Sequence, residues 1–140
     1  MDTSPVITRL RAQLTGFKSV GGAAELDAAA SIAPATPSAF VMPLAETAEA
    51  PSLAGIHDQR IEQSFAVVIV LANRRDATGA AAAQDLHALR MQVRAALLGW
   101  VPDASNGETV AFTSGRLIRL DDGRLWWSDE FRVYTDYRSH

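Results

Sequence analysis

The run Phe65-Ala66-Val67-Val68-Ile69-Val70-Leu71 is continuously apolar and rich in β-branched residues, and it is the strongest fold signal in the chain. Such a run is typical of a strand at the centre of a sheet that is covered on both faces. Upstream, from Gln59, apolar and polar residues alternate, which extends the strand with one partly exposed face. A membrane span needs about 18 or more apolar residues, so we predict that the chain does not cross a bilayer.

A long amphipathic helix is predicted after this strand. Its apolar residues recur every three or four positions, as one face of a helix requires: Leu86, Leu89, Val93, Leu97 and Trp100. Polar residues, including His87 and Arg90, occupy the other positions. Gly99 and Pro102 are typical of the end of a helix.

The last third of the chain predicts a β-hairpin. Asp122-Gly123 suits a two-residue type I′ turn, which sets the register of both strands. One face of the hairpin then carries the pairs Leu120 with Leu125, Ile118 with Trp127, Phe112 with Val133, and Arg116 with Asp129. On the other face Arg119 meets Trp126, which suits a cation–π contact.

The first part of the chain predicts two short helices and one strand. Ser4-Pro5 is a helix start signal, and a weaker helix covers residues 23–30. Phe40 to Leu44 reads as a strand in which Pro43 cannot donate a hydrogen bond, so the strand lies at an edge or carries a bulge. Residues 45–58 are small, polar and interrupted by proline, and we expect a long loop or a flexible arm there.

Together these elements predict a single α+β domain over residues 1–140. We expect a mixed or mainly antiparallel sheet of about four strands, packed against one long helix and one or two short N-terminal helices.

Composition excludes several classes of function. The chain has 13 Lys and Arg against 16 Asp and Glu, and a net charge of −3 argues against general nucleic-acid binding. The absence of cysteine excludes disulfides, thiolate metal sites and cysteine nucleophiles. The N-terminus lacks the pattern of a signal peptide, so we expect a cytoplasmic protein.

No catalytic, cofactor-binding or metal-binding residue is predicted. Gly21-Gly22 precedes a helix but lacks the lysine and the glycine spacing of phosphate-binding loops. His57 next to Asp58 could be imagined as a base with its orienting group, but no activated serine motif accompanies them. His87 has no second metal ligand one helical turn away, and His140 ends the chain.

Five segments resemble, in this order and spacing, the tail terminator proteins of tailed bacteriophages, and the nearest likeness is to the Mu-like tail proteins of prophages. The segments are PSAFVMPL at 37–44, QSFAVVIV at 63–70, NRRD at 73–76, ALLGWVP at 96–102 and GRLWWSDEF at 123–131. The likeness extends from Val6 to Arg138.

This resemblance implies a subunit that assembles into a ring, commonly six-fold, at the head-proximal end of the tail tube. Such a ring stops tube polymerisation and provides the surface on which the head or its connector docks, while DNA passes through without specific binding. The resemblance implies no cofactor and no catalytic residue. It places the chain in the bacterial host cytoplasm during assembly and in the virion tail.

A ring subunit must present two different complementary surfaces. The candidate surfaces are the edge strand, the segment that follows it, the loop after the apolar strand and an outward tryptophan. Their residues are Pro43, Leu53, Ile56, Arg74, Arg75 and Trp126.

Three alternatives stay open. A neck or head-completion protein would share the size and the fold class. A small hydrolase or ligand-binding domain would use His57 and Asp58 in a pocket. A DNA-binding accessory protein is disfavoured by the net charge.

Overall fold

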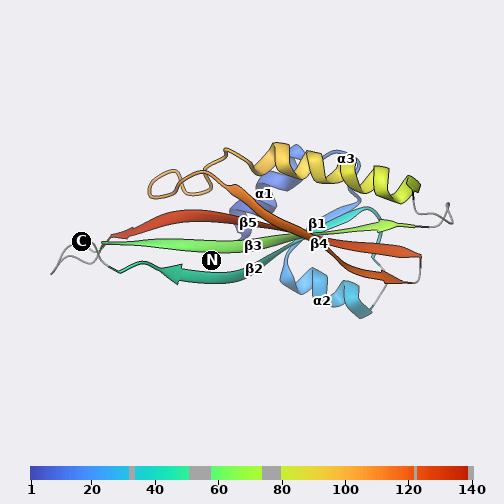
Figure 1. Cartoon of the computed structure of the whole chain (residues 1–140), viewed down its shortest axis with the longest axis horizontal. Helices are drawn as coiled ribbons and strands as arrows, with labels where there is room; N and C mark the ends of the chain where they lie inside the picture. Colours follow the sequence, from blue (N-terminus) through green and yellow to red (C-terminus); the bar gives the residue numbers. More distant parts are fainter. Residues whose placement is uncertain (32–33, 51–57, 74–79, 122, 139–140) are drawn as a thin grey trace.

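The computed structural model describes residues 1–31, 34–50, 58–73, 80–121 and 123–138. They form one five-stranded sheet in the order β1-β2-β3-β5-β4 (Figure 1). The strands are β1 (Ser19–Gly21), β2 (Ser38–Ala48), β3 (Asp58–Ala72), β4 (Ala111–Asp121) and β5 (Arg124–Arg138). β1 pairs with β2 in parallel, and the other neighbours are antiparallel.

Three helices cover the sheet, so the predicted α+β class is confirmed. α1 (Ser4–Gln13) and α3 (Ala80–Leu97) lie on one face, and α2 (Ala23–Ser31) lies on the other (Figure 1). The sheet has five strands rather than about four, because β1 was not predicted. A three-residue strand is too short to show an alternating pattern in the sequence.

The predicted apolar strand is the centre of the sheet. β3 pairs with β2 on one side and β5 on the other, and residues 65–71 are buried. Alternate side chains enter two cores: Phe65, Val67 and Ile69 pack below α1 and α3, and Val68 and Val70 pack on the α2 side. A continuous apolar run is therefore required, because both faces of β3 are covered.

An aromatic cluster joins three strands within the larger core. The Phe65 and Phe131 rings stack with centroids 5.5 Å apart, and the Phe112 ring meets Phe131 edge-on at 5.7 Å. Phe65 and Phe131 are fully buried. This contact fastens β3, β5 and β4 to one another through side chains as well as backbone hydrogen bonds.

The predicted connection over residues 45–58 needs correction at its start. β2 continues through Ala48, opposite Ile61, and the Glu49 amide donates to the Arg60 carbonyl at 2.8 Å. Small and polar side chains do not prevent this pairing, because the ladder is made by the backbone. The bulge expected at Pro43 is confirmed, since the register shifts between Pro43 and Ala45.

The predicted hairpin is confirmed near its turn and wrong further along. Leu120 pairs with Leu125, and Arg119 pairs with Trp126, with the guanidinium 5.4 Å from the indole centroid. Two bulges in β4 then shift the register, each by one residue. The resulting pairs are Leu117 with Trp127, Arg116 with Ser128, Gly115 with Asp129, and Phe112 with Phe131.

Each bulge adds one residue to β4 that has no partner in β5. The extra residues are Ile118 and Thr113. Counting outward from the turn fails here, because it assumes that both strands advance by one residue at each step.

We expect Phe131→Ala to lower the free energy of unfolding by about 3–5 kcal/mol, because it removes the ring at the centre of the aromatic cluster. Chemical denaturation followed by circular dichroism measures this loss. Tyr137→Ala is the control, since Tyr137 lies on the same strand and is 57% exposed. Its expected change is within about 0.5 kcal/mol. Equal losses in both variants would contradict the assignment of Phe131 to the core.

Candidate functional site

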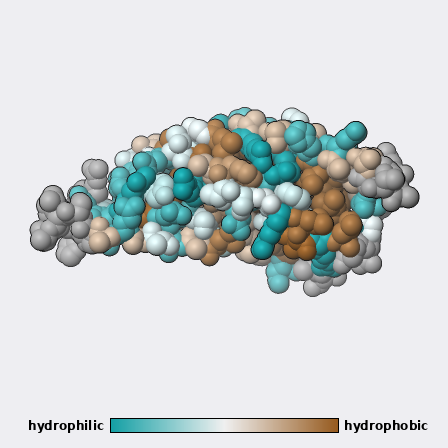
Figure 2. All heavy atoms as spheres, viewed as in Figure 1, coloured by the Kyte–Doolittle hydropathy of each residue, from teal (hydrophilic) through white to brown (hydrophobic). Residues whose placement is uncertain are grey.

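The outer edge of β4 is an apolar surface. β4 is the last strand in the sheet order, so its outer side pairs with no other described strand. Three aliphatic residues near the hairpin end are about half exposed: Leu117 (49%), Ile118 (51%) and Leu120 (56%). Figure 2 shows apolar atoms gathered at the end of the molecule where this hairpin lies. Exposed apolar groups on an open strand edge are typical of a protein interface.

The opposite edge of the sheet is also largely open. β1 covers only Ser38–Phe40 of β2, so residues 41–48 have no described strand on their outer side. The residue inserted by the bulge, Leu44, is 48% exposed. The Met1 ammonium lies 2.6 Å from the Glu46 carboxylate and, together with the Gln63 amide, holds the pKa of Glu46 below its usual value.

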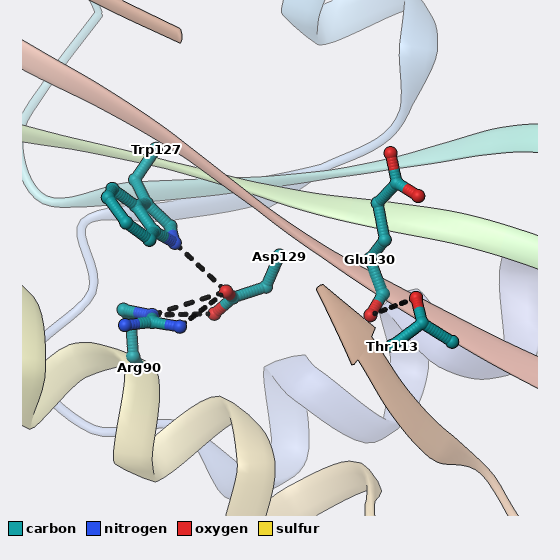
Figure 3. Close-up of polar contacts among 5 residues, drawn as sticks. All are labelled: Arg90, Thr113, Trp127, Asp129 and Glu130. Carbon is teal, nitrogen blue, oxygen red and sulfur yellow. Dashed lines mark hydrogen bonds and ion pairs between the residues drawn. The ribbon is translucent and has the colours of Figure 1, made fainter. Parts of the chain in front are cut away.

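A buried ion pair lies directly beneath the β4 edge (Figure 3). The Asp129 carboxylate is fully buried on the helix-covered face of β5. Arg90 of α3 donates to it from Nε at 3.0 and 3.2 Å and from Nη2 at 2.9 Å. The Trp127 indole donates at 2.9 Å, and its ring lies 4.5 Å from the Arg90 guanidinium carbon.

Gly115 of β4 provides the space for this ion pair. A Cβ atom at this position would lie 2.4 Å from Asp129 Oδ1 and 2.8 Å from Arg90 Nη2. Such approaches are closer than real Cβ contacts, so a side chain here would displace the pair. Gly115 faces Asp129 because Ile118 is inserted as a bulge; without that extra residue Arg116 would stand there instead.

This arrangement fastens α3 to the sheet and leaves no reactive group open to a substrate. Both carboxylate oxygens accept hydrogen bonds from the chain itself, and the carboxylate is shielded from water. The predicted hairpin register paired Asp129 with Arg116, whereas the structure pairs it with Arg90. Gly115 was the one sequence signal for this site, because a glycine inside a strand often marks the close approach of another group.

The long strands project beyond the helices (Figure 1), and hydrophilic side chains gather on this polar projection (Figure 2). On one of its faces the Arg60 guanidinium lies 3.8 Å from the centre of the Tyr134 ring, and Arg60 bonds Glu108 at 2.8 Å. The Tyr134 hydroxyl donates to Glu62 at 3.0 Å. The hydrogen bond to the Glu108 carboxylate raises the pKa of Arg60.

The predicted interface residues have different outcomes. Pro43 is exposed on the open part of β2. Trp126 is only 7% exposed, because Ala29 of α2 packs with it against the sheet, so the layer that covers this indole is the chain's own. Leu53, Ile56, Arg74 and Arg75 lie outside the described residues.

The hairpin pairs predicted for Ile118 and Leu120 did not indicate that these aliphatic side chains are exposed. Local patterns could not show that the outer side of β4 pairs with no other described strand. That property follows from the strand order, which local patterns do not contain.

The hydrolase alternative gains no support. His57 lies outside the described residues, and Asp58 begins β3. His87 is exposed on α3. Within the described ranges no three His, Asp or Glu side chains converge as metal ligands would. The described helices include none with the length and apolar character of a membrane span.

Comparison with known proteins identifies the family. A family model for the phage tail terminator protein matches residues 1–139. The chain belongs to this tail terminator family. It is therefore a structural protein of the phage tail and assembles with other virion proteins. Structural proteins of this kind are not a class of enzymes. The predicted family is confirmed, whereas the Mu-like subgroup stays a prediction.

A solved structure titled "Virion of native gene transfer agent (GTA) particle" contains a chain of similar fold. That chain is 18% identical, with a TM-score of 0.55, and the match covers 94% of the tail terminator chain and 92% of the other. At this identity the likeness supports the fold alone. A search of curated proteins finds no match.

We expect Arg90→Ala to destabilise the protein by about 3–5 kcal/mol, because it leaves the buried Asp129 carboxylate unpaired. Denaturant unfolding measures this change. The matched control is Arg60→Ala, which breaks the exposed ion pair with Glu108 and is expected to change the free energy of unfolding little. A loss no larger than that of the control would show that Arg90 does not stabilise the fold.

Proposed function

We propose that copies of this chain form a six-fold ring at the head-proximal end of the tail tube. The ring ends polymerisation of the tube and provides the surface on which the head or its connector docks. The observation that carries this proposal is the family match over residues 1–139. The name of that family describes termination of the tail, and the match spans every described element.

The geometry of the sheet supports a ring. A closed ring with one kind of subunit needs two unlike surfaces that fit each other in a head-to-tail arrangement. β4 forms one edge of the sheet, and residues 41–48 of β2, beyond the short β1, form the opposite edge; neither pairs with another described strand on its outer side. A subunit with these two edges can bind one neighbour on each side.

The remaining partners follow from the same proposal. The tail tube protein binds one end of the ring and the head or connector protein binds the other. DNA passes through the ring, and a subunit with a net charge of −3 does not attract the phosphate backbone. Assembly takes place in the cytoplasm of the bacterial host, and the function requires no cofactor.

Electron microscopy of tails assembled with and without this chain tests the function. Without it we expect overlong, unfinished tubes, because nothing caps the growing end. With it, we expect tubes of uniform length that end in a six-fold ring.

The same experiment separates the alternatives. Tubes of normal length in the absence of the chain would contradict termination. If those tubes also lacked heads, the result would favour a neck or head-completion protein.

A further inference from the structure

We propose that neighbouring subunits join by pairing the outer edge of β4 of one copy with residues 41–48 of β2 of the next. This inference rests on the proposed ring and specifies the surface through which neighbouring subunits of the ring contact each other. The partner is a second copy of this chain, and the contact is an antiparallel extension of the sheet.

The strand directions permit this pairing. β2, β3, β5 and β4 alternate in direction across the sheet, so β2 and β4 run in opposite directions. If the strands run roughly parallel to the ring axis, rotation about that axis keeps their directions in the next copy. The β4 strand of one copy therefore meets β2 of its neighbour in antiparallel orientation, as the rest of the sheet pairs.

The two edges carry matching irregularities. Each has a bulge whose inserted residue is an exposed aliphatic side chain: Leu44 in β2 and Ile118 in β4. A bulge normally protects an open edge by disrupting its ladder. When both edges are bulged at facing positions, the disruption falls at one place and the two apolar side chains cover each other.

Aligning the two bulges sets the extent of the contact. With Ile118 opposite Leu44, antiparallel counting places Asp121 opposite Val41 and Ser114 opposite Ala48. The open part of β2 is then covered along its whole length. β4 ends at Asp121, next to the point where β1 begins to cover β2, so the two strands do not compete for the same edge.

Charge complementarity favours the same alignment. β4 has two arginines, with one acidic residue, Asp121, at its end, whereas β2 has Glu46, which also contacts the Met1 ammonium, and no basic residue. The alignment places Arg116 opposite Glu46. Opposite charges at facing positions stabilise strand pairs.

Site-directed cross-linking tests this interface, because the natural chain has no cysteine. We expect Leu44→Cys combined with Ile118→Cys, treated with a short bis-maleimide in assembled tails, to give a ladder of covalent multimers that ends at the ring number. A mixture of the two single variants should give no species beyond dimers, because each subunit then carries one reactive group.

The matched control replaces Leu44→Cys with Leu98→Cys, keeping Ile118→Cys. Leu98 is 42% exposed and directly follows α3, where it forms a bridge with Val110 and contacts no residue of the β2 edge. No ladder is expected from this pair. A ladder from the control pair, or none from the Leu44 and Ile118 pair in tails of normal length, would overturn the inference and leave the terminator function intact.

Charge reversal gives a second test. We expect Arg116→Glu to reduce the proportion of tails that carry a ring, and Glu46→Arg in the same chain to restore it. Arg132→Glu reverses an exposed arginine on β5 away from both edges and should leave ring assembly unchanged. Failure of the second substitution to restore assembly would contradict the proposed register.

Discussion

The buried carboxylate of Asp129 is the constraint from which much of this structure follows. An unpaired charge at this depth would cost several kcal/mol, so the chain must supply partners, and Arg90 and Trp127 do so. The arginine reaches the carboxylate only where the adjacent strand has no side chain. Gly115 meets that need, and the bulge at Ile118 brings Gly115 opposite Asp129. The need to pair this buried carboxylate thereby fixes the position of α3 on the sheet and the register of β4.

The same bulge shapes the outer surface. Ile118, the residue it inserts, lies half exposed on an edge strand, beside the exposed Leu117 and close to Leu120. A long open edge with apolar residues is a liability in a protein that stays alone, and it is useful in one that assembles. In the ring that we propose, each copy covers the open edge of its neighbour. β4 then contributes to both: Gly115 accommodates the buried ion pair, and Ile118 lies in the proposed contact between copies.

The family to which this chain belongs is one of structural proteins of the phage tail. Its strongest polar cluster is shielded from water, and the clearest features of its surface are strand edges and a polar projection. These features match a subunit that binds copies of itself and other virion proteins. In the ring that we propose, mild negative charge suits a subunit close to the path of DNA, because it does not attract the phosphates.

Local patterns in the sequence determined the elements of the fold. The apolar run at 65–71 specified the central strand, helical spacing specified α3, Pro43 marked an irregular edge, and Asp122-Gly123 set the first pairs of the hairpin, including Arg119 with Trp126. Each of these signals acts over a few residues, through turn chemistry or side-chain periodicity. Only the tertiary structure decided that Asp129 pairs with Arg90, that Trp126 lies beneath α2, and that the outer side of β4 pairs with no other described strand. These depend on the order of strands and on bulges that shift the register, and such features arise from contacts between segments far apart in the chain.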